Sequence, residues 1–254
     1  MLIHPTLEQL RSLRLDGMVK ALEEQLQTAE ISDLSFEDRL ALLVAREVTE
    51  RDSRRLKTRL KSAKLRHRNA CVEDIDHRSH RGLDKGLLLS LGSCEWIAQH
   101  RNVLITGPTG VGKTFLACAL AQKACREGYT VEYLRLPRLF EELALAHADG
   151  RYPKRMAALA RTDLLVLDDW GLAPLGDADR RELLELLEDR HELRSTLVTS
   201  QLPLEAWHDA IDHPTLADAI LDRLVHNAYR LELRGESMRR KRALAKPASA
   251  EKAA

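Results

Sequence analysis

One short segment, Gly107-Pro108-Thr109-Gly110-Val111-Gly112-Lys113-Thr114, constrains the fold of this chain more than any other feature. It has the pattern G-x-x-x-x-G-K-[ST], in which glycines let the backbone curl so that its N–H groups point at phosphate oxygens. Lys113 adds a mobile positive charge for the β- and γ-phosphates, and the hydroxyl of Thr114 is a ligand for Mg²⁺. We therefore predict that residues 107–114 bind the phosphates of a nucleotide.

The flanking residues predict the strand and the helix that such a loop needs. Residues 102–106 are a short apolar run, which is typical of a buried parallel strand. Residues 115–127 place apolar side chains on one helical face and end before a glycine, a common helix C-cap. Later strands are predicted at 130–134, 163–168, 195–199 and 229–233, with helices between them. This alternation predicts an α/β fold, a three-layer αβα arrangement around a parallel sheet.

Two consecutive acids end the apolar run Leu164–Leu167, about 50 residues after the glycine-rich loop. Open α/β sheets bind ligands at the carboxyl ends of their strands, so Asp168 is predicted to hold Mg²⁺ directly or through water. Asp169 follows and is predicted to polarise the attacking water. The next strand ends in Thr199-Ser200-Gln201, where a polar side chain can contact the γ-phosphate and the water. This layout predicts an ATPase rather than a small-molecule kinase.

The N-terminal part of the chain is predicted to be helical and carries a strongly basic stretch. Between Arg51 and Arg68 there are nine basic residues and one acid, Asp52, so we expect no acidic partners at i,i+4 spacing. A solvated charged face is the ordinary explanation for such a run, but the nearly pure sign favours a nucleic-acid surface. The residues predicted to contact DNA are Arg51, Arg54, Arg55, Arg59, Lys61 and Lys64, with Lys154 and Arg155 in a second basic segment.

These patterns divide the chain into four parts. We predict an N-terminal helical DNA- or partner-binding domain at 1–70, a connector at 71–100, an ATPase domain at 101–246 and a disordered tail at 247–254. The net charge of +1 implies no partner by itself. The sequence has no apolar run of transmembrane length and no signal-peptide pattern, so we expect a cytoplasmic protein without a membrane partner. Its four cysteines lack C-x-x-C spacing, which disfavours a zinc site or a disulfide framework.

Five segments together resemble IstB-type proteins. These are the AAA+ helper ATPases encoded beside the transposase in bacterial insertion sequences, and they are relatives of the DnaC-type helicase loaders. The resemblance covers nearly the whole chain, and the segments outside the glycine-rich loop make it specific. They are Leu13–Met18, Gly107–Thr114, Arg138–Leu143, Leu167–Leu172 and Thr199–Pro203.

The resemblance implies a P-loop NTPase of the AAA+ class that oligomerises on double-stranded DNA and recruits and stimulates its cognate transposase. It implies that Lys113, Thr114, Asp168 and Asp169 form the hydrolytic site for ATP and Mg²⁺. Gln201 resembles the sensor-I residue, a position where AAA+ proteins often have Asn. Arg223 resembles the arginine finger that reaches a neighbour's γ-phosphate, and Arg239 resembles the sensor-II arginine. Only about 20 residues follow the last predicted strand, so we expect a minimal or absent C-terminal lid.

Three other functions remain open from the sequence. A DnaC-like replicative helicase loader has the same fold and a helicase as its partner. A P-loop phosphotransferase would need a small acceptor and ignore DNA, which the basic stretch 51–68 and the polar strand end 199–201 argue against. A non-catalytic nucleotide switch is disfavoured by the intact acids Asp168 and Asp169 together with Lys113.

Overall fold

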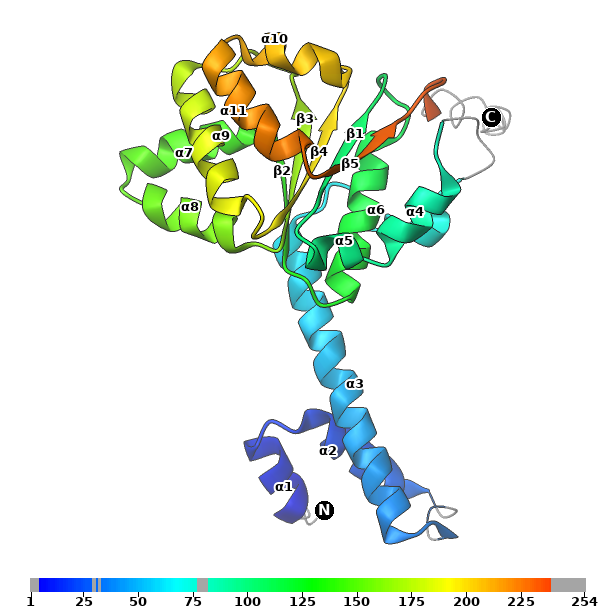
Figure 1. Ribbon diagram of the computed structural model, residues 1–254. Coiled ribbons are helices and arrows are strands. Elements are labelled where there is room, and N and C mark those ends of the chain that lie inside the picture. Colours follow the sequence, from blue (N-terminus) through cyan, green and yellow to red (C-terminus); the bar gives the residue numbers. More distant parts are fainter. Residues whose placement is uncertain (1–4, 29–30, 32, 77–81, 239–254) are drawn as a thin grey trace, which may run out of the picture. The chain divides into compact units, whose positions relative to one another are not determined.

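The computed structural model describes residues 5–28, 31, 33–76 and 82–238. The chain divides into two compact units, residues 1–58 and 59–254. Helix α3, Phe36–Ala63, includes the division, and the two units are described separately here (Figure 1).

The first unit consists of helices α1 (Pro5–Ser12), α2 (Asp16–Gln27) and most of α3. The start of α2 lies very close to α3, since a Cβ atom at Gly17 would come within 2.6 Å of Glu47 Cα. The Glu47 carboxylate accepts hydrogen bonds from the backbone N–H groups of Gly17 at 2.7 Å and Met18 at 3.2 Å. Glu47 thus caps α2, and glycine is the residue that the close approach permits.

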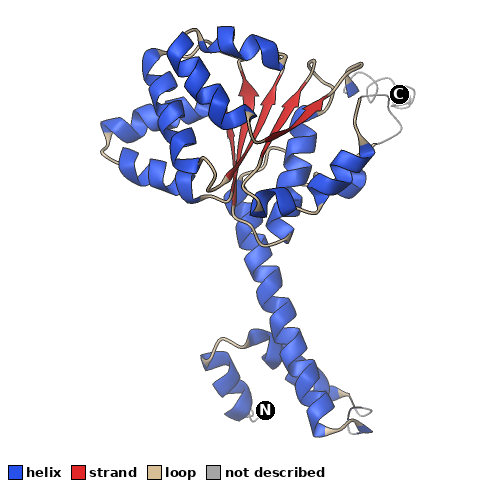
Figure 2. Ribbon diagram, viewed as in Figure 1, coloured by secondary structure: helices blue, strands red, loops and turns tan. Residues whose placement is uncertain are grey.

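A parallel five-stranded sheet forms the centre of the second unit (Figure 2). Its order is β2-β3-β4-β1-β5, and each predicted strand agrees with an observed one to within two residues. The α/β fold with a parallel sheet predicted from the sequence is therefore confirmed. The strands are β1 (Asn102–Thr106), β2 (Val131–Arg135), β3 (Leu164–Trp170), β4 (Ser195–Ser200) and β5 (Ala228–Glu232).

Helices cover both faces of the sheet, as right-handed crossovers in this strand order require (Figure 1). One face carries α6 (Lys113–Arg126), with α4 (Lys85–Gly92) and α5 (Glu95–Ala98) beside it. The other face carries α7 (Leu136–Ala148), α8 (Tyr152–Arg161), α9 (Asp177–Arg190), α10 (Trp207–Ile211) and α11 (Pro214–Val225).

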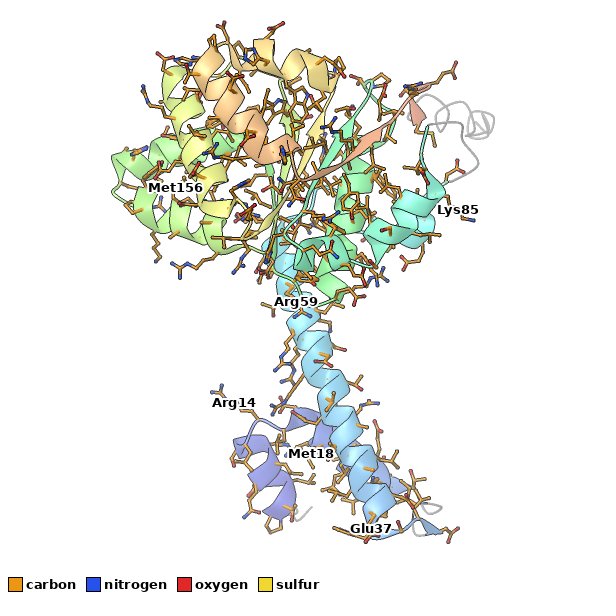
Figure 3. The ribbon with its side chains drawn as sticks, viewed as in Figure 1. Arg14, Met18, Glu37, Arg59, Lys85 and Met156 are labelled. Carbon is orange, nitrogen blue, oxygen red and sulfur yellow. The ribbon has the colours of Figure 1, made fainter. Side chains whose placement is uncertain are left out.

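The core on this second face is built from leucines and two tryptophans. The rings of Trp170, at the end of β3, and Trp207, at the start of α10, stack with centroids 4.8 Å apart. Met156 of α8, labelled in Figure 3, packs in the same buried cluster. This packing fixes the carboxyl end of β3, where the predicted Mg²⁺ ligand Asp168 and the predicted catalytic acid Asp169 lie.

After β5 the description of the chain ends at Met238. The predictions for Arg239, for the C-terminal lid and for the tail at 247–254 therefore concern residues outside the described part. The four cysteines are free thiols. No helix in the described ranges is long and apolar enough to cross a membrane.

Candidate active site

The glycine-rich loop joins β1 to α6 and is packed against the segment that follows β5. Gly107 has a φ of 142°, and a Cβ atom there would collide with the carbonyl oxygen of Leu233. Leu233 N–H donates to Thr106 O at 2.8 Å, and Met238 N–H donates to Gly110 O at 2.9 Å. The segment after β5 therefore holds the loop in its curled form at two points.

Lys113 begins α6 and turns back over the loop. Its ammonium group donates hydrogen bonds to the carbonyl oxygens of Gly107 at 2.6 Å and Pro108 at 2.9 Å. The residue before it, Gly112, has no side chain to cap the helix. The first N–H groups of α6 and the Lys113 ammonium thus face the same loop, which is the arrangement that binds an anion.

Asp168 is fully buried and accepts hydrogen bonds from three hydroxyl groups. Thr114 Oγ1 lies 3.0 and 3.1 Å from its two carboxylate oxygens, and the hydroxyls of Tyr133 and Thr199 also donate to it. Burial and the bond to Asp168 raise the pKa of Tyr133, so this phenol stays a donor at neutral pH. Nη1 of Arg66 lies 3.9 Å from Oδ2 of Asp168. The glycine-rich loop and the acidic strand end therefore meet in one polar cluster.

The strand is irregular where the second acid follows the first. Successive side chains of a regular strand point to opposite faces, which would separate Asp168 from Asp169. Asp169 has a φ of +65°, and the pairing of β3 with β4 shifts register between Leu167 and Trp170. This bulge leaves Asp169 lining the same cavity as Lys113.

Asp169 is engaged by an arginine that the sequence did not single out. Arg135, the last residue of β2, donates from Nε to Asp169 Oδ2 at 2.7 Å. The Asp169 N–H group donates to Thr199 Oγ1 at 3.4 Å. Asp169 is thus held through both its carboxylate and its backbone N–H group.

Gln201 reaches the glycine-rich loop rather than the acids. Its Oε1 accepts a hydrogen bond from Thr109 Oγ1 at 2.6 Å. The strand-end residue that contacts both Asp168 and Asp169 is Thr199, two positions earlier.

Sequence reasoning thus missed four residues of the cluster as site residues. The sequence carries a signal for two of them. Tyr133 and Arg135 lie two positions apart at the carboxyl end of a predicted strand, so their side chains are expected on the same face of the sheet. Thr199 belongs to the polar strand end 199–201, from which the sequence pattern assigns only Gln201 to the site. Arg66 belongs to the basic stretch 51–68, which the sequence assigns to DNA rather than to the nucleotide site.

A cavity of about 410 Å³ opens beside these groups. Its size falls in the range of small-molecule and cofactor sites. The segment before β1 and the segment after β5 both contribute to its wall. Among its lining residues are Arg66, Ile75, Lys113, Asp169, Gln201 and Met238.

Arg223 lies away from this cavity. Its guanidinium pairs with Glu188 of α9 and donates to Ala219 O at 2.9 Å. Its carbonyl oxygen accepts a bond of 3.0 Å from the side chain of Asn102, the first residue of β1. The glycine-rich loop follows the other end of β1, about 16 Å away for a five-residue strand. Arg223 is therefore not brought together with Lys113 of its own chain.

The predicted absence of acidic partners for the basic stretch is wrong. Arg51 pairs with Glu47 at 2.6 Å, Arg54 pairs with Asp16 at 2.6 Å, and Arg55 lies 3.6 Å from Asp52. Glu47 lies one helical turn before the stretch and Asp16 belongs to another helix, so a count of charges along the stretch does not include them. Charge at this end of the stretch is largely neutralised locally.

The remaining basic residues that are predicted to contact DNA differ in how accessible their side chains are. Arg59, labelled on α3 in Figure 3, donates from Nε to the carbonyl oxygen of Cys125 at 2.9 Å. Arg155 is largely buried between Glu132 at 2.8 Å and Glu142 at 3.0 Å. Lys61, Lys64 and Lys154 are exposed.

Solved structures share the fold of this chain. The crystal structure of DnaI matches with a TM-score of 0.56 and 21% identity, over 65% of this chain and 91% of that chain. The crystal structure of the DnaC helicase loader matches with a TM-score of 0.55 and 20% identity, over 65% of this chain and 97% of that chain. These matches show the AAA+ type of α/β fold, which confirms the predicted fold class.

Sequence comparison places nearly the whole chain in one family. The profile described as IstB-like ATP binding protein matches residues 8–246. The y4pL protein of Sinorhizobium fredii, named as an insertion-sequence ATP-binding protein, is 54% identical over 240 residues, 94% of this chain and 98% of that protein. The ATP-binding protein named for insertion sequence IS1162 of Pseudomonas fluorescens is 52% identical over 203 residues, 80% and 88% of the two chains. This chain therefore belongs to the family of IstB-like ATP-binding proteins.

Proposed function

We propose that this protein is a cytoplasmic ATPase that helps an insertion sequence to transpose. It binds ATP, assembles on double-stranded DNA, and recruits and stimulates the transposase of its element. The observation that carries the ATPase proposal is the contact of Thr114 with Asp168, because it joins the phosphate-binding loop to the acidic strand end. The family and the names of its members support the link to insertion sequences.

The residues present fit a bound Mg²⁺ ion. In the described part of the chain no group of three or more His, Cys, Asp or Glu side chains could hold a metal. Mg²⁺ in nucleotide sites, however, takes only one or two protein oxygens together with substrate phosphates and water. We assign Thr114 and Asp168 as those protein ligands. When bound, the ion would supply positive charge that offsets the negative charge of the phosphates.

The remaining residues have distinct roles in the proposed reaction. Lys113 binds the β- and γ-phosphates and exchanges its two carbonyl contacts for phosphate oxygens. Asp169 accepts a proton from the attacking water, as a general base within hydrogen-bond reach of it. Thr199 holds both acids in place, and Gln201 orients the loop through Thr109.

Assembly completes the proposed site. Arg223 lies about one strand length from its own loop, so it is suited to serve a neighbouring subunit, where it would leave Glu188 for the γ-phosphate. Hydrolysis would then require a homo-oligomer. Because DNA aligns several subunits, it should promote that oligomer through multivalent binding.

The test is ATP turnover with and without duplex DNA, using Lys113→Ala as the control for contaminating ATPases. We expect DNA to stimulate turnover by the natural chain and to leave the Lys113→Ala variant inactive. Turnover that needs a small acceptor and ignores DNA would instead indicate a phosphotransferase. Affinity for the transposase rather than for a replicative helicase separates a transposition helper from a helicase loader. The structural likeness to DnaI and DnaC does not decide between them, since it shows the fold alone.

A further inference from the structure

The segment that follows α3 brings a guanidinium into the candidate active site. Arg66 is the third residue after the end of α3, and its side chain lines the cavity together with Gly110, Lys113 and Thr114. Its Nη1 atom lies 3.9 Å from Oδ2 of Asp168. A residue from outside the sheet therefore reaches the carboxylate that we assign to Mg²⁺.

The backbone of this segment is anchored while the Arg66 side chain is not enclosed. Leu65 is buried, and the ring of His67 lies 5.9 Å from the ring of Phe115 on α6. Burial raises the pKa of the Cys118 thiol on α6, and the backbone at His67 and Arg66 lowers it through hydrogen bonding, which places this segment against α6. The Arg66 side chain itself is 42% exposed. It can therefore change partners without unfolding the segment.

Asp168 is a weak partner for Arg66. The hydroxyls of Thr114, Tyr133 and Thr199 occupy the close positions on the carboxylate, and Arg66 remains at the long limit of an ion pair. A metal ion on the same carboxylate would repel the guanidinium, since like charges at this distance are unfavourable. Bound nucleotide would at the same time bring several negative charges into the cavity.

The place of Arg66 in the cavity indicates which phosphate it meets. Lys113 would contact the β- and γ-phosphates, and a metal held by Thr114 and Asp168 would offset the negative charge of the phosphates nearest to it. Arg66 lies on the Asp168 side of the cavity, hence on the metal side. A guanidinium is well suited to phosphate because its planar donors match two phosphate oxygens.

We propose that Arg66 binds the terminal phosphate of ATP bound to its own subunit, and that it leaves Asp168 to do so. The inference rests on the proposed function, because it requires ATP in this cavity. It makes Arg66 a residue that distinguishes ATP from ADP. Since Arg66 follows α3 directly, the same exchange links the state of the nucleotide to the end of that helix.

The test is the affinity for ADP and for a non-hydrolysable ATP analogue, measured by calorimetry with Mg²⁺ for the full-length chain. Arg66→Ala should weaken binding of the ATP analogue about ten-fold and binding of ADP less than two-fold, since one charge-assisted contact is lost. Arg68→Ala, an exposed arginine two residues further on, is the matched control and should change neither affinity. Arg66→Lys keeps the charge but loses the planar fork, so it should give a smaller loss confined to the ATP analogue.

Equal losses for the two nucleotides, or no loss for either, would overturn the proposal and leave Arg66 as a counter-charge for Asp168. If Arg66→Ala does not fold, as judged by its thermal melting, an Arg66→Lys variant without an ATP-specific loss overturns it. Failure of the proposed function gives a different result. A natural chain that binds both nucleotides but never hydrolyses ATP would contradict the ATPase and still allow the Arg66 comparison.

Discussion

Nε of Arg135 lies 2.7 Å from Oδ2 of Asp169, across two neighbouring strands of the sheet. The carboxylate proposed as the general base is therefore paired with a cation. The Arg135 side chain is 42% exposed and that of Asp169 is 17% exposed, so the pair lies at the mouth of the cavity. Pairing restrains the carboxylate and lowers its availability to a water molecule.

Removing this pair should raise basal hydrolysis. Arg135→Ala frees Asp169, and we expect DNA-independent turnover to rise about two- to five-fold, the range set by a partly exposed ion pair. Arg138→Ala is the matched control, because Arg138 is exposed and pairs with Glu141 of its own helix rather than with Asp168 or Asp169. Steady-state ATPase rates without DNA give the answer. Slower turnover in Arg135→Ala would show that the pair positions Asp169 for catalysis, and unchanged turnover would show that the pair does not restrain the reaction.

Asp169→Asn should separate binding from hydrolysis. The amide cannot accept the proton of water, so we expect turnover to fall by about 10²–10⁴. ATP affinity should stay within a few-fold of the natural chain, because Lys113 and the loop are intact. Calorimetry and a phosphate-release assay measure the two quantities. Normal turnover in this variant would remove Asp169 from the catalytic role.

Mixing two inactive variants tests whether Arg223 acts on a neighbouring subunit. Arg223→Ala lacks the finger, which in related chemistry is worth about 10³–10⁵ in rate, and Lys113→Ala lacks nucleotide binding. In mixed oligomers an intact Lys113 site can meet an intact Arg223, so some activity should return. Arg230→Ala, an exposed arginine on β5, should be active alone. No recovery in oligomers shown to be mixed would contradict the assignment.

Glu47 should make the stability of the first unit depend on pH. Burial alone would raise the pKa of Glu47, but hydrogen bonds from Arg51, Met18 and Gly17 outweigh it and hold the pKa below its usual value. A lowered carboxyl pKa contributes stability that is present above the unfolded value of about 4.3 and is lost as the pH falls through the folded value. Glu47→Gln should therefore cost about 1–3 kcal/mol at pH 6 and progressively less below pH ~4.

Thermal unfolding of the natural chain and the Glu47→Gln variant at a series of pH values measures this difference. Glu37→Gln, at the exposed start of α3, is the control and should show no such trend. A stability difference that is constant from pH 6 to pH 3 would show that the charge on Glu47 is not involved.

The sequence predicted those parts of the site that depend on local pattern. Lys113 and Thr114 are fixed by the loop and the helix that follows, and Asp168 by the end of an apolar strand. The strand order followed from none of these patterns, because it depends on which strands pair across the sheet. The contact of Thr114 with Asp168 is such a long-range consequence.

Other features of the site could not be predicted because they oppose a local rule. Strand periodicity places Asp168 and Asp169 on opposite faces, and the bulge at Asp169 is what lets Asp169 line the cavity next to the buried Asp168. The pairing of Arg54 with Asp16 joins two helices that are far apart in the sequence. Charge counted along a single stretch could not reveal that neutralisation.

The revised distribution of charge changes where DNA contact is expected. Arg51, Arg54 and Arg55 have acidic partners, and Arg59 donates to a backbone carbonyl. Lys61 and Lys64, both exposed at the end of the stretch, are the better candidates for phosphate contacts. Lys61→Ala with Lys64→Ala should reduce the salt slope of DNA binding by up to about two units, one for each lost contact.

The most direct test of the account is the affinity for duplex DNA as a function of salt concentration, measured by fluorescence anisotropy with ATP, with ADP and without nucleotide. For the natural chain we expect tight, salt-sensitive binding with ATP and binding at least about ten-fold weaker with ADP, because ATP promotes the multivalent assembly. The double lysine variant should show the shallower slope with ATP. Equal DNA affinity in all three nucleotide states would contradict the claim that this family member is an ATP-controlled DNA-binding helper.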